Sequence, residues 1–178
     1  MPNYRRSWHP GGTYFFTVNL LERSGNDLPV RHIDHLRDAV RHVRINHPFT
    51  IHAWVVLSDH LHCVIELPIG DADFAVRWRL IKIRFSKSLP QTEWRSATRV
   101  RRGERGIWQR RYWEHMIRNE HDYGKHVDYI HYNPVKHGYT QCAAAWPYST
   151  IHRYIAAGTV TRDWGASESS EDVQFGER

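Results

Sequence analysis

The stretch from residue 54 to residue 67 constrains the fold more than any other part of the chain. Two apolar runs flank a short polar turn at Ser58 and Asp59, a pattern that predicts an antiparallel β-hairpin. His60 and His62 begin the second run two residues apart, so their side chains point to the same face of the strand. Two imidazoles on one face can bind one divalent metal ion. Cys63 is expected on the opposite face, in the core.

The histidine pair alone is a weak indication of a metal site. The chain contains 14 histidines in 178 residues, a number that gives roughly one His-x-His pair by chance. The alternative is that both rings are ordinary core residues. The metal interpretation therefore depends on what other parts of the chain place on the same face.

The composition favours a nucleic-acid partner. The chain carries 25 Lys and Arg against 19 Asp and Glu, a formal net charge of +6, together with eight Trp, nine Tyr and six Phe. A basic domain of this size typically meets a polyanion, and aromatic rings interleaved with arginines suit unpaired bases. The alternative is a tryptophan-rich core with solvated basic helix faces.

Several classes of protein are not expected. No stretch approaches the roughly 18 apolar residues of a membrane span, and no signal-peptide pattern follows Met1. The two cysteines, Cys63 and Cys142, provide neither a disulfide framework nor a cysteine-based zinc site. We therefore expect a cytosolic protein in a reducing compartment, without a membrane anchor.

Hydrophobic periodicity predicts an α+β domain over residues 1–158, followed by an acidic, mobile tail over 159–178. The expected order is β-α-β-β-α-β and a further helix, which is the ferredoxin-like split βαβ arrangement: a four-stranded antiparallel sheet with helices packed on one face. Residues 90–106 are expected to form a long arginine-rich loop. The elements are strands at 13–20, 49–57, 61–67 and 107–117, and helices at 29–46, 72–89, 120–133 and 149–157.

The helix after the fourth strand carries a second set of chemical groups. Tyr129 and Asn133 are separated by four residues and share one helix face, with His126 one turn before Tyr129. Lys136 lies near that face if the helix continues past Pro134, which is expected to end or kink it. The apolar positions Val127 and Ile130 are expected to point elsewhere. The alternative is that the tyrosine merely covers the core.

Several blocks of sequence together resemble one family. His60-Leu61-His62 and the run from Asp128 to Gly138 (DYIHYNPVKHG) resemble the REP-associated tyrosine transposases, a bacterial branch of the single-tyrosine HUH transposases. Tyr4-Arg5-Arg6, the run from Gly11 to Val18 and the run from Trp108 to His115 also resemble that family. The likeness covers about residues 4–155 and keeps the motifs in order.

The resemblance implies an HUH nuclease fold and a tyrosine nucleophile, Tyr129, on the helix after strand four. It implies a divalent metal, Mg²⁺ or Mn²⁺, bound by His60, His62 and a polar residue one turn past the tyrosine, here Asn133. Cleavage and strand transfer of single-stranded DNA at palindromic hairpins would proceed through a 5′-phosphotyrosine, with the protein acting as a monomer or a homodimer. Residues expected to assist the tyrosine are Lys136 and His126, and those expected to contact DNA are Arg5, Arg6, Arg110 and Arg111.

Two rival classes were compared with this interpretation. A histidine-triad nucleotide hydrolase also begins from alternating histidines on a strand, but the next alternate position here is Val64. A non-catalytic DNA- or RNA-binding module on the same scaffold is the stronger rival. A covalent protein–DNA adduct distinguishes the two, because a binding module forms only salt-sensitive complexes.

Overall fold

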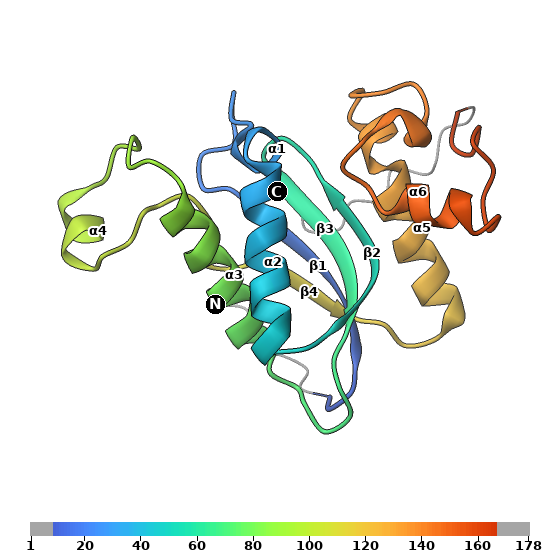
Figure 1. Ribbon diagram of the computed structural model, residues 1–178, viewed down its shortest axis with the longest axis horizontal. Coiled ribbons are helices and arrows are strands. Elements are labelled where there is room, and N and C mark those ends of the chain that lie inside the picture. The colour runs from blue at the N-terminus through green and yellow to red at the C-terminus, as the bar shows by residue number, and fades with distance from the viewer. Residues whose placement is uncertain (1–8, 167–178) are drawn as a thin grey trace, which may run out of the picture.

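A four-stranded antiparallel sheet forms the centre of the protein, whose computed structural model describes residues 9–166 (Figure 1). The strand order is β2-β3-β1-β4, which is the predicted ferredoxin-like order, and every neighbouring pair is antiparallel. Arg5, Arg6 and residues 167–178 of the predicted tail lie outside the described residues. The strands are β1 (Thr13–Asn19), β2 (Thr50–Val56), β3 (His60–Glu66) and β4 (Trp113–Met116).

Helices α2 (Ile33–Asn46) and α3 (Phe74–Ser88) pack together over one face of the sheet, as predicted (Figure 1). Alternate residues of β1 and β3, among them Phe16 and Cys63, meet these helices in the larger core. The single helix expected over 29–46 is instead two, α1 (Leu28–Arg31) and α2, because the backbone at His32 leaves the helical region (φ −115°, ψ 40°).

Helix α5 (Glu120–Lys136) covers the opposite face, with the short helices η1 (Ala143–Ala145) and α6 (Ile151–Ala156) beside it (Figure 1). Val127 and Ile130 pack there against Phe15 and Val64. The expectation that these two apolar residues point away from the histidine face is wrong. His62 and Val64 are two residues apart on β3, so both side chains point to the same face. This face of the sheet therefore carries both the histidines and the apolar surface that binds α5.

Two predicted boundaries differ from the structure. Strand β4 is four residues long where 107–117 was expected, and Trp108 forms only an isolated bridge with Leu20. Between them the backbone follows α3, since Lys82 donates to the Gln109 carbonyl at 2.9 Å. Helix α5 continues through Pro134 to Lys136. A proline costs the helix one hydrogen bond, and the buried position of Pro134 retains the last turn against the sheet.

The long segment 90–106 contains a short helix, α4 (Ala97–Arg101), and projects beyond α3 on the side away from α5 (Figure 1). Residues 159–166, at the start of the predicted tail, form turns, and the Trp164 ring lies 6.3 Å from that of His131 on α5. Within residues 9–166, no helix has the length and hydropathy needed to span a membrane.

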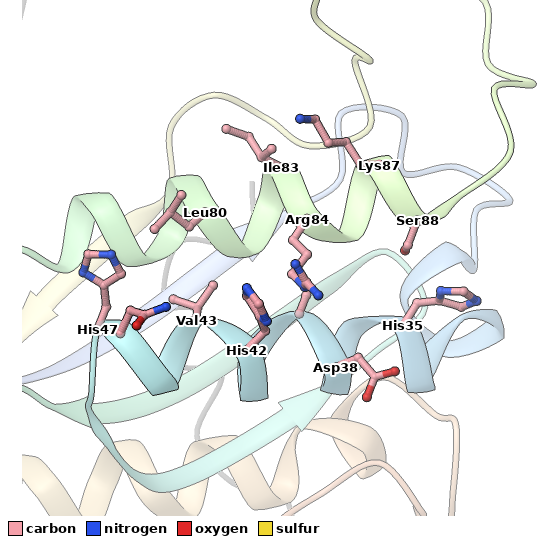
Figure 2. A pocket seen from close by; sticks show the side chains of 12 residues that line it. His35, Asp38, His42, Val43, His47, Leu80, Ile83, Arg84, Lys87 and Ser88 are labelled. Atoms are coloured by element: carbon pink, nitrogen blue, oxygen red, sulfur yellow. The ribbon is translucent and has the colours of Figure 1, made fainter.

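A groove of about 610 Å³ lies between α2 and α3, on the side of the molecule away from α5 (Figure 2). Residues of both helices line it, and Arg84 extends from α3 toward α2 (Figure 2). The sheet separates this groove from the face that carries His60 and His62. Its polar lining residues include His35, Asp38, His42, His47 and Lys87.

Buried His131 makes the stability of the fold sensitive to acid. Its Nε2 lies 3.1 Å from the Thr150 hydroxyl, which also binds the backbone of β2. Burial, together with the charge of Arg153, lowers the pKa of His131 from 6.5 to about 4. The unfolded chain therefore binds a proton that the folded chain excludes, and stability is lost as the pH falls through that window.

The expected loss attributable to His131 is about 3 kcal/mol between pH 6.5 and pH 4. His131→Gln, whose amide can still reach Thr150, should be less stable near neutral pH and should lose about that much less on acidification. Urea unfolding at both ends of the window measures the difference. Parallel pH profiles for the wild type and the variant would contradict the assignment.

Candidate active site

His60 and His62 lie at the start of β3, under the C-terminal half of α5. Strand alternation places both on the α5 face, and both are fully buried. Their ring centroids are 4.8 Å apart with the planes at 84°. Because imidazole binds a metal in the plane of its ring, two steeply inclined neighbouring rings can direct nitrogens to one shared point.

Each histidine is oriented through its Nδ1 atom. His60 Nδ1 donates to the Asp59 carboxylate at 2.6 Å, and His62 Nδ1 is 2.8 Å from the Thr17 hydroxyl. Burial raises the pKa of Asp59, but hydrogen bonds from His60 and Arg23 outweigh it and lower the pKa to about 2. Burial, followed by the charges of His60 and His137, lowers the pKa of His62, so its ring is neutral. Neutral histidines held by Nδ1 are typical metal ligands.

The Nε2 atom of His60 supports the same conclusion. It is buried and has no hydrogen-bond partner in the described structure. Leaving a buried polar atom unsatisfied costs about 1–3 kcal/mol, and a metal ion bound at this position would remove that cost. The side chains of His60 and His62 thus suit a divalent metal, and Asn133 remains a predicted third ligand.

Helix α5 places Tyr129 beside the histidine pair. The Tyr129 ring centroid is 5.2 Å from that of His62 and 6.0 Å from that of Phe15. The Lys136 ammonium lies 4.8 Å from the centre of the Tyr129 ring and donates to its hydroxyl oxygen at 3.3 Å. Asn133, one turn further on, is completely buried. One face of the helix therefore brings Tyr129 and Lys136 close to His62.

A pocket of about 440 Å³ adjoins the histidines, where α5 ends. Arg23, Asp59 and His137 are among the residues that line it, and the His137 ring is 5.3 Å from that of His60. An arginine and an imidazole at the rim of the site are suitable partners for a phosphate oxygen. The pocket reaches His60 only through Asp59 and His137, both of which contact that ring.

A separate group of ligand-type residues lies near the start of α5. The ligand atoms of His115, Asp122 and His126 all lie within 4.8 Å of one another, which makes them a candidate His/Asp metal site among the described residues. However, the rings of His115 and His126 are stacked, 4.6 Å apart with only 16° between the planes. Stacked rings cannot both point at one ion, so this arrangement favours metal binding less than that of His60 and His62.

Contacts within this group explain the position of His126 without a metal ion. His126 Nδ1 donates to the Asp122 carbonyl at 2.7 Å, and its ring lies 4.8 Å from that of Phe15. The Asp122 carboxylate accepts from His115 Nε2 at 2.8 Å and from the Arg118 amide at 3.0 Å. These contacts tie the first turn of α5 to β4. Of the two residues expected to assist the tyrosine, Lys136 is placed at its hydroxyl and His126 in this anchoring group.

The arginines predicted to contact DNA lie away from the histidines along the chain. Arg110 is exposed and pairs with Glu104 through two contacts of 2.7 and 2.9 Å, and Arg111 is exposed beside it. Both precede β4. Arg5 and Arg6 fall outside the described residues, so all four remain predictions.

Sequence reasoning missed the residues that orient the histidines. Thr17 lies 45 residues before His62, and only the pairing of β1 with β3 brings them together. Asp59 directly precedes His60, and this adjacency of a carboxylate to a candidate ligand was the available signal. Arg23 and His137 gave no such signal, because loops carry them to the site.

Comparisons with known proteins agree with this geometry. No protein-family profile matches the chain. A REP-associated tyrosine transposase of Escherichia coli K12 is 45% identical over 178 residues, covering 100% of this chain and 98% of the relative. A Haemophilus influenzae protein assigned to the same family is 42% identical over 169 residues, covering 94% and 95%. A solved structure of a REP-associated tyrosine transposase bound to a REP hairpin superposes with a TM-score of 0.86 at 45% identity, covering 100% of this chain and 98% of that one.

A ferredoxin-like sheet with a histidine pair facing a tyrosine on the following helix defines the tyrosine transposases of the HUH class, which are enzymes that act on DNA. The sequence is more than 40% identical, across nearly the whole chain, to two proteins of one branch of this class. The chain belongs to the family of REP-associated tyrosine transposases.

Proposed function

We propose that this transposase cleaves single-stranded DNA beside a palindromic hairpin and transfers the strand through a covalent 5′-phosphotyrosine at Tyr129. The observation that carries the proposal is the position of Tyr129, with its ring 5.2 Å from His62 and its hydroxyl on Lys136. A relative of similar fold was solved bound to a REP hairpin, and hairpin repeats in the chromosome would place the protein in the cytoplasm at the nucleoid.

The residues divide the chemistry between them. The Tyr129 oxygen forms a bond to phosphorus, the bond from phosphorus to the 3′ oxygen breaks, and the departing oxygen takes up a proton as a 3′-hydroxyl. A free 3′-hydroxyl can later attack the phosphotyrosine, which rejoins strands and regenerates the tyrosine. The number of phosphodiester-type bonds is unchanged in each step, so no ATP is needed.

His60 and His62, together with Asn133, would bind a divalent metal, for which we propose Mg²⁺ or Mn²⁺. Such an ion neutralises charge on the scissile phosphate when bound. Asp59 and Thr17 keep the two rings oriented through their Nδ1 atoms. Nitrogen and amide oxygen ligands without a thiolate suit these hard ions.

The test is incubation of the full chain with labelled hairpin DNA carrying single-stranded flanks, with Mg²⁺ or Mn²⁺, on a denaturing gel. A tyrosine transposase gives a labelled band that survives denaturation and is lost after protease treatment. Hairpins that bind tightly and never give this band would overturn the proposal and favour a non-catalytic DNA-binding module.

Lys136 should accelerate formation of the phosphotyrosine without being essential. Its ammonium favours the phenolate over the phenol, so Lys136→Met is expected to slow cleavage by about 10- to 100-fold and to move the rate profile to higher pH. Single-turnover cleavage across a pH series measures both. Lys125→Met, which removes an exposed lysine of the same helix, is the control. A uniform loss of rate with an unchanged pH profile would assign Lys136 a purely structural role.

A further inference from the structure

The segment from residue 90 to residue 106, which we call the arm, carries a solvent-exposed tryptophan, a residue that is normally mostly buried. Trp94 is 81% exposed and Val100 is 54% exposed. The arm extends away from the sheet beyond α3, and no other helix of residues 9–166 covers it (Figure 1). A tryptophan offered to solvent on a projecting segment indicates a contact with another molecule.

The arm is also strongly basic. It contains five arginines and two glutamates. Both carboxylates form ion pairs at the base of the arm, Glu93 with Arg105 and Glu104 with Arg110. The other four arginines of the arm therefore leave it with an excess of positive charge. They are Arg95, Arg99, Arg101 and Arg102.

The base of the arm is tightly bonded. The Arg105 guanidinium donates to the carbonyls of Leu89 and Pro90 at 3.1 and 2.7 Å and also pairs with Glu93, and its side chain is 11% exposed. The Ser96 hydroxyl caps α4 by accepting from the Arg99 amide. These contacts present Trp94 and the arginines on a preformed support, which lowers the entropic cost of binding.

The arm leaves the sheet at the end that carries the histidines. Its return strand meets the chain just after β1, where Leu20 bridges Trp108 and the Leu21 amide donates to the Ile107 carbonyl. Asn19, the preceding residue of β1, pairs with His60. A DNA molecule whose cleaved bond lies at the histidines can therefore pass around this end of the sheet and reach the arm, which projects on the side away from α5 (Figure 1).

We propose that the arm is a second DNA contact of this transposase, binding unpaired nucleotides away from the cleaved bond. Trp94 stacks on a base, and Arg101 and Arg102, both exposed, contact the phosphates beside it. Single-stranded DNA is the partner that matches both features, because bases stack on aromatic rings while the backbone follows the positive charge. The inference deepens the proposed function, since the ligand is the same DNA substrate.

The experiment measures fluorescence anisotropy of labelled hairpins with and without single-stranded flanks, using the full chain. Trp94→Ala should weaken binding of the flanked hairpin by about 5- to 100-fold and leave the trimmed hairpin unaffected. The double variant R101Q/R102Q should reduce the slope of log affinity against log salt by about one to two. The matched control is R37Q/R41Q, which removes two exposed arginines from α2.

The possible outcomes separate this inference from the proposed function. Unchanged affinity in the arm variants, or equal weakening in the α2 control, would overturn the role of the arm. Formation of the covalent adduct is also measured in the same proteins at saturating DNA. If the wild type forms no adduct but the arm variants bind the flanked hairpin more weakly, the catalytic proposal fails and the arm contact stands. If the wild type forms the adduct and the arm variants bind as the wild type does, the arm contact fails and the catalytic proposal stands.

Discussion

Tyr129→Phe should abolish the covalent protein–DNA adduct, reducing cleavage by at least about 10³-fold. The substitution removes the hydroxyl that we propose as the nucleophile and keeps the ring that packs near Phe15 and His62. Affinity for hairpin DNA should stay within about twofold, because binding depends mainly on phosphate contacts elsewhere. A denaturing gel of labelled DNA measures the adduct, and anisotropy measures the affinity.

The matched control is Tyr132→Phe, at the next tyrosine along α5. Tyr132 is half-buried and packs near Gly165, not near the histidines, so this variant should form the adduct at the wild-type rate. An adduct that persists in Tyr129→Phe and disappears in Tyr132→Phe would move the nucleophile to the other tyrosine. Loss in both variants would point to damage to the helix, which thermal unfolding would detect.

His60→Ala and His62→Ala should each reduce cleavage by at least about 10³-fold while hairpin binding persists. The rings are buried 4.8 Å apart on one face of β3, so removal of either leaves an incomplete ligand set. Chelation with EDTA should stop the wild-type reaction, and added Mn²⁺ should restore it. Titration of Mn²⁺ binding by calorimetry gives a readout that does not depend on activity, and both variants should bind the ion more weakly.

A milder substitution tests the same site in case the alanine variants fail to fold. Asp59→Asn keeps both rings and removes only the carboxylate that holds His60 Nδ1, so we expect about a 10- to 100-fold loss of metal affinity or rate. His42→Ala, at an exposed histidine of α2, should change neither property. Full cleavage by folded His60→Ala and His62→Ala, with EDTA having no effect, would exclude the metal site proposed here.

Local sequence patterns were reliable where one element alone decides geometry. Alternation along residues 61–67 placed His62 opposite Cys63, which is buried in the other core. Four-residue spacing put Tyr129 and Asn133 on one face of α5. The strand order also followed from the succession of elements, because the split βαβ arrangement permits few alternatives.

Patterns failed where two elements compete for the same residues. Pro134 was expected to end or kink α5, but the helix continues to Lys136 with Pro134 buried, and this last turn brings the ammonium to Tyr129. Residues 107–117 have the composition of a strand, yet side-chain contacts with α3 draw most of them out of the sheet. The intrinsic strand propensity of a residue stabilises a strand less than tertiary packing can stabilise another conformation.

Local patterns in the chain are enough to predict that two histidines share a strand face, that a tyrosine and an asparagine share a helix face, and that the fold is α+β with a four-stranded sheet. The packing of the elements in three dimensions was needed to place α5 on the face opposite α2 and α3, where it brings Tyr129 to His62. It also decided which partners orient the rings, since Thr17 comes from a strand 45 residues away. Periodicity fixes directions within one element, whereas distances between elements follow from how their buried surfaces fit together.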